Sequence, residues 1–537
     1  MALKYLYVPS GYKAGTAYGV LPNDSSADFD LFTRNSFATR TNKDGLIEVC
    51  ETSGNNLATN GDFATDSDWV IGDSSITISA GKANFTDTPN GEGLQLNNIL
   101  TTGKTYEVTF TVFDYVEGSI KVRYPFIAPS VSSNGVHTVT GIAVTSSGGS
   151  DDLRFQVTGE TTLKIDDVIV KEVLSNVPRI DYLDEGCPSL LLETQRSNLC
   201  RASEAVQFWG INRSSTTVVN SNQVISPDGS KNAAVVTTGF LNGGVYGLQV
   251  YTISNTHYSS SVYAKHISGE SKVRFVISPN LHFGSGDKRI IVDLSDGSLV
   301  NNELSGVAEA KVIDVGNGWY RLIIEDSNVV SGGGGSAKIA VYADSGSFSQ
   351  FSVWGGQIEV GNYTSSYIPH HDVLSNSQTT RSGDAAKFAG DFEFNSNEGV
   401  LEARFKAVPI SIPTSRITIG EPTANNRIAL GYSGGTNEPK PFLMIDSPTG
   451  DDEIMVSMPS SFNLFDYNTY KFKFQSGNNE LKINGELVET DNTFKTRTFA
   501  FDKELTSVSF NSSRTSTLRL FYGTVQYIKI YDSATDF

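Results

Sequence analysis

Residues 177–199 read VPRIDYLDEGCPSLLLETQRSNL, and the blocks on either side of this stretch behave like separate β-rich modules. It begins with a strand-like run at 179–182, turns at Gly-Cys-Pro-Ser (186–189), and passes through the apolar run 190–192 into polar residues at 193–198. It contains no paired base and nucleophile. We therefore interpret it as a structural connector, which acts as a latch between modules.

Working outward from this latch, the chain starts one pattern in residues 1–56, breaks it off, and returns to it in residues 174–199. Residues 1–56 are extended and rich in Tyr and Phe, with turn signals that include Lys43-Asp44-Gly45. The sequence predicts a small irregular N-terminal region that residues 174–199 complete. It leaves open whether the two parts form a single discontinuous domain.

Length and composition indicate an all-β protein of three or four domains. The chain has 537 residues, with 50 Gly and only 4 Met, which fits many short strands joined by turns. We expect several jelly-roll and concanavalin A-like β-sandwiches in series and almost no helix. With 41 Lys and Arg against 59 Asp and Glu, the net charge is −18, and no basic stripe is found. This balance argues against nucleic acid as a partner.

The N-terminus lacks the apolar core of a signal peptide, and no later segment approaches 18 uninterrupted apolar residues. We therefore expect a soluble product, made in a cytoplasm, without membrane insertion. Three cysteines, Cys50, Cys187 and Cys200, are too few and of the wrong parity for a disulfide framework, and their spacings match no zinc site. Cys50 and Cys187 flank the same interruption and can lie close in space, and we expect reduced, partly buried thiols.

Residues 57–173 are predicted to form an inserted β-sandwich with the strand order of a jelly roll. In the strand 105–113, apolar side chains alternate with polar ones, which places one face in a core and the other in solvent. The buried set is Tyr106, Val108, Phe110 and Val112, and the solvent set is Glu107, Thr109 and Thr111.

Two further sandwiches follow the latch. Residues 200–372 are predicted to form the second, residues 373–383 a polar linker, and residues 384–537 a concanavalin A-like or laminin G-like sandwich. The strongest local signal in the last block is Asn484-Gly485 between two alternating runs, because both residues of such a hairpin turn must accept positive φ.

Motifs spread over about the first 370 residues resemble large virion proteins of tailed bacteriophages, the head-fibre and tail-fibre type that carry lectin-like sandwiches. These motifs are Phe32-Thr33-Arg34, the segment 44–48 (DGLIE), the latch segments 177–182, 189–193 and 196–199, Pro227-Asp228-Gly229, the segment 317–321 (NGWYR), the segment 353–359 (VWGGQIE) and the segment 366–369 (SYIP).

The resemblance implies that the N-terminal region anchors the protein to the particle, and that the inserted sandwich is similar to carbohydrate-binding modules. Such modules stack sugar rings on exposed aromatic side chains. The candidates for this role are Tyr115, Tyr124 and Phe126, against the alternative that they are core or sheet-face residues. No cofactor is expected beyond a structural Ca²⁺, which Asp62 and Asp166 or Asp167 would hold with backbone carbonyls.

Three candidate catalytic patterns each lack a feature that catalysis requires. Residues 431–435 match the G-x-S-x-G nucleophile pattern, but every His lies upstream and prolines follow in place of a helix. The acidic run Asp451-Asp452-Glu453 is consecutive, so its carboxylates would point to opposite faces of a strand. Asp28 and Asp30 occupy alternate positions, but they are a lone pair in a turn-rich segment, which is weak evidence for paired catalytic carboxylates. We therefore expect a protein that is not an enzyme.

The sequence favours a structural virion protein, a head or tail fibre that displays glycan-binding sandwiches for host adhesion at the virion surface after assembly in the host cytoplasm. By family analogy it would be a homotrimer that contacts capsid or tail proteins through its N-terminal region. Two alternatives stay open. One is a polysaccharide depolymerase or glycosidase, and the other is a capsid decoration protein that binds no sugar.

Overall fold

The chain is almost entirely β, as its composition predicts. The computed structural model describes residues 3–13, 15–19, 32–124, 126, 128–143, 151–184, 186–212, 217–247, 250–251, 257–278, 287–304, 309–328, 336–370, 378–386, 393–409, 414–421, 426–433, 440–511 and 519–537. Within these ranges, helix is limited to α1 (Asn492–Lys495) and the 3₁₀ turns η2 (Val206–Phe208) and η3 (Ala534–Asp536). None of the helices described is long and apolar enough to span a bilayer.

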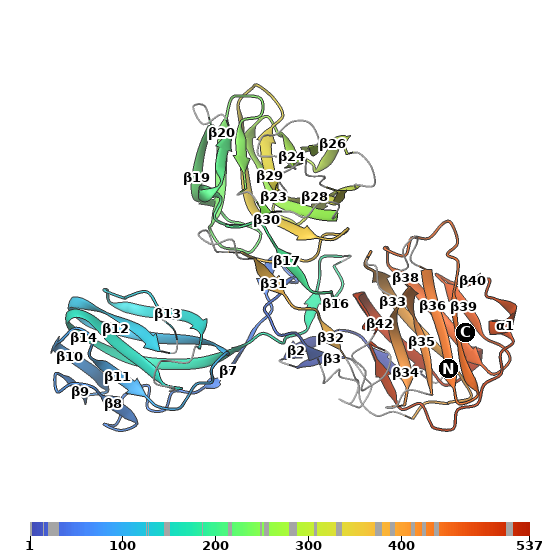
Figure 1. The fold of residues 1–537 in the computed structure, drawn as a ribbon, viewed down its shortest axis with the longest axis horizontal. Helices are drawn as coiled ribbons and strands as arrows, with labels where there is room; N and C mark the ends of the chain where they lie inside the picture. The colour runs from blue at the N-terminus through green and yellow to red at the C-terminus, as the bar shows by residue number, and fades with distance from the viewer. Residues whose placement is uncertain are drawn as a thin grey trace. The chain divides into compact units, whose positions relative to one another are not determined.

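The chain separates into two compact units, both visible in Figure 1. The inserted unit runs over Glu51–Ser175, where the sequence predicts an insert at 57–173. The main unit combines Met1–Cys50 with Asn176–Phe537 and therefore contains the latch.

The inserted unit is a β-sandwich built on two long strands that pair with each other along most of their length. The alternation predicted for its central strand is confirmed, because Tyr106, Val108, Phe110 and Val112 are all buried in one core. The strands are β7 (Thr52–Asn56), β8 (Trp69–Ile71), β9 (Ile76–Ser79), β10 (Lys82–Thr88), β11 (Gly93–Leu96), β12 (Thr105–Tyr124), β13 (Gly135–Ile142) and β14 (Leu153–Leu174). Their order is β13-β12-β14-β10-β9, and β11 and β7 pair with β14 while β8 pairs with β11.

The second sandwich consists of two antiparallel sheets that share one apolar core. One sheet has the order β18-β21-β29-β24-β25-β26, with β22 beside β29, and the other has the order β19-β20-β30-β23-β28-β27. The strands are β18 (Gly210–Asn212), β19 (Thr217–Val224), β20 (Ala233–Thr238), β21 (Gly244–Tyr246), β22 (Val250–Tyr251), β23 (His257–Gly269), β24 (Lys272–Ser278), β25 (Lys288–Asp293), β26 (Ser298–Glu303), β27 (Glu309–Asp314), β28 (Trp319–Asn328), β29 (Ser336–Ala343) and β30 (Ser349–Val360).

The third sandwich packs an eight-stranded sheet against a five-stranded one. The predicted hairpin is present, with Asn484 and Gly485 at φ values of 50° and 87° between β39 and β40. The larger sheet has the order β15-β16-β42-β33-β38-β39-β40 with β1 beside β42, and the smaller has β37-β36-β35-β34-β41. The strands are β1 (Leu3–Tyr7), β15 (Arg179–Asp181), β16 (Ser189–Leu192), β33 (Glu398–Ala407), β34 (Ser415–Gly420), β35 (Arg427–Ser433), β36 (Lys440–Ser447), β37 (Gly450–Met455), β38 (Asn468–Gln475), β39 (Glu480–Ile483), β40 (Glu486–Val488), β41 (Ser507–Ser509) and β42 (Gly523–Tyr531).

The N-terminal strand differs from the sequence expectation of a separate irregular region. β1 pairs with the C-terminal strand β42, so that Leu3 lies opposite Tyr531, and β16 of the latch pairs with the other end of β42. Tyr5 and Tyr7 are fully buried in the core of the third sandwich, together with Leu190. The burial of these apolar side chains makes the N-terminus and the latch integral parts of that sandwich.

Short pairs of strands tie the remaining latch segments together. The predicted polar linker 373–383 is only partly a linker, because β31 (Thr379–Arg381) pairs with β17 (Arg196–Asn198) and Arg381 is buried; residues 371–377 lie outside the described ranges. The other pairs are β2 (Gly11–Lys13) with β3 (Thr16–Tyr18), β4 (Phe32–Thr33) with β32 (Ala385–Ala386), and β5 (Thr39–Thr41) with β6 (Ile47–Val49).

All three cysteines are free thiols. Cys50 and Cys200 are buried, whereas Cys187 is exposed, so the expectation that the thiols are partly buried is wrong. Burial raises the pKa of the Cys50 thiol to about 11, although the Arg40 guanidinium acts in the opposite direction. Burial also raises the pKa of Cys200 to about 12. Both buried thiols are therefore protonated and unreactive at neutral pH.

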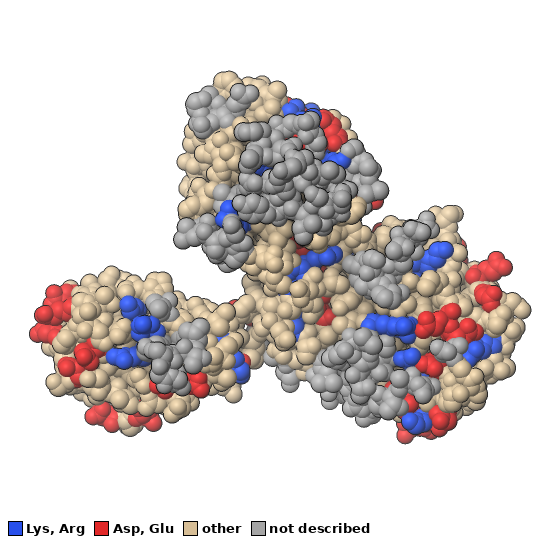
Figure 2. Space-filling view, in the orientation of Figure 1, with Lys and Arg blue, Asp and Glu red and all other residues tan. Residues whose placement is uncertain are grey.

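Charged side chains are scattered over the surface. Among the residues drawn in colour in Figure 2, Lys and Arg occur in small groups, many beside Asp or Glu, and form no continuous stripe on the face shown.

The burial of the N-terminal strand predicts that Tyr5→Ala destabilises the third sandwich by about 3–5 kcal/mol, because the change leaves a large cavity in a closed core. Leu3→Ala, on the same strand but 40% exposed, is the matched control and should change the free energy of unfolding by less than about 1 kcal/mol. Urea unfolding measures both. Equal effects of the two substitutions would contradict the packing of β1.

Candidate functional site

Of the aromatic residues that the sequence proposes for sugar stacking, the structure describes two side chains, and neither is fully exposed. Phe126 is 8% exposed and packs in the core of the inserted unit, where a Cβ on Gly141 would lie 2.4 Å from its ring. Tyr115 is half-buried against the same core, and its hydroxyl donates to the carbonyl of Gly118 at 3.1 Å. The backbone of Tyr124 pairs with Arg154, but its side chain lies outside the described residues. Phe126 is therefore corrected to a core residue.

Each carboxylate proposed for Ca²⁺ has a local partner. Asp166 pairs with Lys82 at 2.7 Å, and Asp167 accepts a hydrogen bond from the hydroxyl of Thr111 at 3.3 Å. Asp62 accepts from the backbone N–H of Ala64 at 3.4 Å. The three do not form a group whose carboxylate oxygens all lie within 4.8 Å of one another, and a Ca²⁺ site of two carboxylates with backbone carbonyls stays a prediction.

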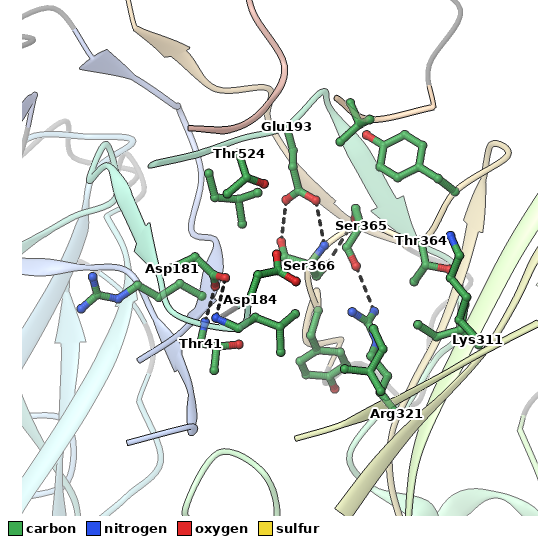
Figure 3. Close-up of a pocket in the computed structure, with 18 of the residues that line it drawn as sticks. Thr41, Asp181, Asp184, Glu193, Lys311, Arg321, Thr364, Ser365, Ser366 and Thr524 are labelled. Atoms are coloured by element: carbon green, nitrogen blue, oxygen red, sulfur yellow. Dashed lines mark hydrogen bonds between the residues drawn. The ribbon is translucent and has the colours of Figure 1, made fainter. Parts of the chain in front are cut away.

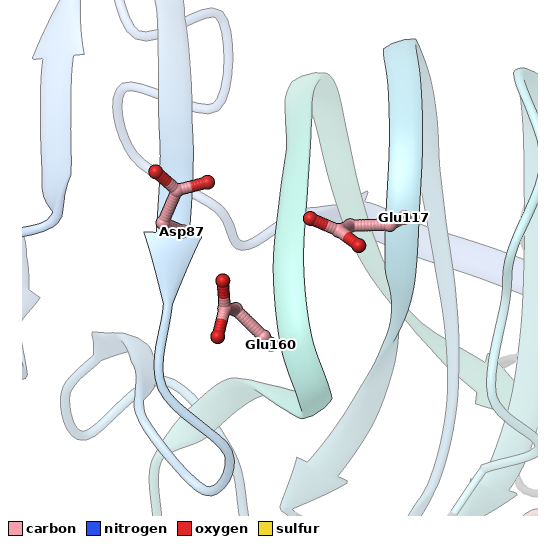
Figure 4. A group of neighbouring side chains, drawn as sticks. All are labelled: Asp87, Glu117 and Glu160. Atoms are coloured by element: carbon pink, nitrogen blue, oxygen red, sulfur yellow. The ribbon is translucent and has the colours of Figure 1, made fainter.

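A different group of carboxylates does converge in the inserted unit. Asp87, Glu117 and Glu160 place carboxylate oxygens within 4.8 Å of one another, and they lie on neighbouring strands in Figure 4. All three are exposed, and Asp87 also accepts from the hydroxyl of Thr162 at 3.1 Å. Exposed carboxylates are well solvated and do not by themselves make a metal site.

The most highly organised polar group of the described chain lies in the main unit, and we call it the buried charge cluster. It consists of Arg34, Arg179, Glu193, Arg381 and Asp384, whose side chains are at most 5% exposed. They come from five places in the sequence. Arg34 follows β4, Arg179 begins β15, Glu193 follows β16, Arg381 ends β31 and Asp384 precedes β32.

Ion pairs and charge-assisted hydrogen bonds connect the cluster without a break. Asp384 accepts from Arg34 at 2.9 Å, pairs with Arg179, and accepts from the backbone N–H of Glu193 at 2.8 Å. Glu193 accepts from Arg179 at 2.6 Å and pairs with Arg381. Bonds of this kind are about twice as strong as neutral ones, and buried charges need such pairing to be tolerated. The Nε atoms of Arg179 and Arg381 are the exceptions within the cluster, because they are buried without a hydrogen-bond partner.

Both carboxylates of the cluster are held ionised. Burial alone would raise the pKa of Glu193, but the guanidiniums of Arg381 and Arg179 outweigh it and hold that pKa well below its usual range. Burial likewise opposes ionisation of Asp384, and Arg179, Arg34 and Arg381 together lower its pKa. Neither carboxylate can therefore serve as a general acid near neutral pH.

The cluster also holds the second sandwich. Glu193 accepts from the backbone N–H of Ser366 at 2.9 Å and from its hydroxyl at 2.8 Å.

Asn198 also bonds the latch to the second sandwich. Its side-chain amide donates to the carbonyls of Gly356 and Ile368 at 3.1 and 2.8 Å. Its Oδ1 accepts from the N–H groups of Cys200 and Ile358 at 2.9 and 3.1 Å. Both the nitrogen and the oxygen of the Asn198 amide thus hydrogen-bond backbone groups that would otherwise be buried without partners.

A cavity of about 260 Å³ lies beside the cluster (Figure 3). Its lining includes the carboxylates Asp181, Asp184, Glu193 and Glu325 and residues from the latch, from β27 and β28, and from the end of β33.

Each carboxylate of this cavity already has partners. Asp181 accepts from the N–H groups of Thr41 and Leu183 at 2.7 and 3.0 Å, and Asp184 pairs with Lys406. Glu325 pairs with Lys311 and accepts from the N–H of Thr364 at 2.7 Å. Burial raises the pKa of Asp181 despite its two N–H partners. The carboxylates that line the cavity are thus already bonded to neighbouring elements, and the cavity is a polar junction between those elements.

Sequence reasoning missed the cluster, although it singled out several of its members as motif residues. Arg34, Arg179 and Glu193 all fall in the motifs quoted above, but a local pattern does not show which arginine meets which carboxylate. Arg381 lies in the segment that the sequence predicts to be a linker, and Asp384 directly follows that segment.

No family model matches the chain, and a search of curated proteins finds no match. Solved structures with some likeness include the tandem CBM22-1–CBM22-2 domains of Paenibacillus barcinonensis Xyn10C, with 10% identity, 58% of this chain and 99% of that chain covered, and a TM-score of 0.25. Trypanosoma rangeli sialidase follows with 10% identity, 96% and 98% covered, and a TM-score of 0.21. Its complex with sialic acid gives 10% identity, 96% and 97% covered, and 0.19. Likenesses this weak carry no argument about function, so the architecture rests on the strand pairing of this chain itself.

The buried charge cluster predicts an acid-sensitive stability of the main unit. Because the folded-state pKa values of Glu193 and Asp384 are depressed, their stabilisation is complete above their unfolded values of about 4 and is lost as pH falls through the folded values. Glu193→Gln should lower the free energy of unfolding by about 3–5 kcal/mol at pH 7, since it leaves buried guanidiniums unpaired.

The difference between wild type and Glu193→Gln should shrink as pH falls below about 4, as measured by urea unfolding at several pH values. The exposed Glu486→Gln is the control and should be neutral throughout. A Glu193→Gln effect that is small, or that does not vary with pH, would contradict the ionised, paired state of this carboxylate.

Proposed function

We propose that the protein is a structural component of a tailed-bacteriophage virion, a head or tail fibre that displays β-sandwiches for adhesion to host-surface glycans. The observation that carries this proposal is a convergence in space. The motifs through which the sequence resembles phage virion proteins, although spread over more than 300 residues, meet around the buried charge cluster and the adjoining joint.

Contacts between these motifs are direct. The N–H of Ile47, in the segment 44–48, donates to the carbonyl of Pro227 at 2.9 Å. The N–H of Ile368, in the segment 366–369, donates to the side-chain oxygen of Gln357, in the segment 353–359, at 2.7 Å. An aromatic group made of Tyr263, Trp319, Trp354 and Tyr367, together with Ile47, packs beside them. The motifs therefore encode a junction that joins domains, which suits a structural part of a particle.

The chemistry around the junction also favours a structural role over a catalytic one. The described carboxylates of the neighbouring cavity are neutralised by Arg or Lys, or bonded to backbone N–H groups. A hydrolase would need one carboxyl free to give a proton to the leaving group and a second to attack or to activate water. We therefore propose a protein that is not an enzyme.

Attachment to the particle is proposed through the third sandwich, because this sandwich contains the N-terminal strand to which the resemblance assigns the anchor. Weak sugar sites on many copies, and on the three chains of a proposed homotrimer, would gain avidity without any additional contact.

Immunogold labelling of purified, intact particles tests the proposal, using separate antibodies raised against the inserted unit and against residues 200–372. We expect both antibodies to label one structure, either the head or the tail. Particles that lack the gene product provide the control for background labelling.

Absence of label from intact particles, with the protein found only free in lysates, would contradict the virion assignment. Incubation of the purified protein with host polysaccharide should leave its viscosity unchanged, and a steady fall in viscosity would establish a depolymerase instead.

A further inference from the structure

The second sandwich has one end at the junction and one end far from it. β30 begins at Ser349 and ends at Val360, whose carbonyl accepts from the side chain of Arg196 in β17. β23 runs antiparallel to it, so Tyr258 lies opposite Val360 and Gly269 lies opposite Ser349. A strand of 12 residues spans about 35 Å, and the loops around Ser349 therefore lie far from the buried charge cluster (Figure 1).

Two adjacent loops at this far end expose large apolar side chains. Phe240 and Leu241, between β20 and β21, are 52% and 44% exposed, and Phe348, just before β30, is 53% exposed. We call these three residues the aromatic tip. Single exposed apolar side chains are ordinary on a protein surface, but a group of three on neighbouring loops is a feature that needs explanation.

The first loop is fixed by its own turn and by the next strand. The N–H of Gly243 donates to the carbonyl of Phe240 at 2.9 Å, which closes a tight turn, and Asn242 takes the positive φ of 62° that the turn requires. Asn242 donates its N–H to the carbonyl of Ala343 at 3.0 Å, and Ala343 donates back to Gly243 at 2.9 Å.

The second loop is fixed against the first and against a third. The carbonyl of Phe348 accepts from the N–H of Glu270 at 2.9 Å, and the next residue, Ser349, lies opposite Thr238 of β20. Arg274 connects the two loops, since it donates to the Asn242 side chain at 2.9 Å and pairs with Asp344. Both phenylalanines therefore stand on rigid backbone, so that binding there would cost little conformational entropy.

We propose that the aromatic tip is a carbohydrate-binding site for an uncharged pyranose unit. Sugar rings present a face of C–H groups that packs on aromatic rings and an edge of hydroxyls that bonds to neighbouring planar polar groups. Phe240 and Phe348 supply the apolar surface, and Asn242 and the Arg274–Asp344 pair supply polar groups beside it. Because this ion pair adds no net charge and the exposed Glu270 adjoins the loop, an anionic sugar is disfavoured.

The size of the tip favours a sugar over a protein partner. Three apolar side chains cover far less than the roughly 800 Å² that each partner contributes to a stable protein interface. The inference rests on the proposed adhesion function and assigns it to this site.

Affinity electrophoresis tests the site with the full chain, in native gels that contain dextran, mannan, galactan or xylan. We expect wild type to be retarded by at least one polymer, and the double variant Phe240→Ala/Phe348→Ala to lose affinity for it by about tenfold or more. Phe208→Ala is the matched control, because Phe208 lies on the same sandwich and is also 52% exposed, and it should bind as wild type does. Thermal unfolding should show all variants folded.

Retardation of wild type that the double variant retains would overturn the tip as the site and leave glycan adhesion standing. Migration of wild type unaffected by all four polymers would overturn the tip and weigh against glycan adhesion, while the particle labelling described above would still decide the virion assignment. Loss of self-association in the double variant, with no effect of any polymer, would show that a second copy of the chain occupies the tip.

Discussion

The organisation of the main unit depends on two buried carboxylates, Glu193 and Asp384, that face three arginines. Charges removed from water are costly unless every one finds a partner, and here the partners come from segments as far apart as residues 34 and 384. The need to pair these charges therefore requires that several distant segments fold together. The N-terminal segment, the latch, the end of the second sandwich and the start of the third must all be in place before these charges are satisfied.

The two ends of the chain meet although other domains lie between them in sequence. β1 and β16 pair with the C-terminal strand β42, and the third sandwich is completed by residues from both ends of the chain. The chain leaves the main unit at position 51 and returns to it after position 175, just before the latch in sequence. An insertion at such a point adds a domain without breaking the pairing that closes the core.

The sequence predicted those features that depend on local pattern. The all-β class followed from composition, the core-facing side chains of β12 from alternation, and the β39–β40 hairpin from Asn484-Gly485.

The sequence did not predict the features that long-range pairing determines. Nothing local to Leu3–Tyr7 shows that its partner is more than 500 residues away, and Arg381 in a Ser- and Thr-rich stretch looks like a solvated linker residue until Glu193 is placed beside it. The prediction that Phe126 contacts a sugar was wrong for a related reason. An aromatic residue near a strand end shows the same sequence pattern whether it faces a core or a sugar.

Hydrogen exchange at two backbone amides tests the central role of the buried charge cluster most directly. The N–H of Glu193 donates to Asp384, and the N–H of Ser366 donates to Glu193, although both residues lie in segments without regular strand pairing. If the cluster holds the junction, these amides should exchange as slowly as those in the centre of β30. Exchange as fast as that of the exposed turn at Ser295 would contradict the account, because it would show that the junction opens independently of the sandwiches it joins.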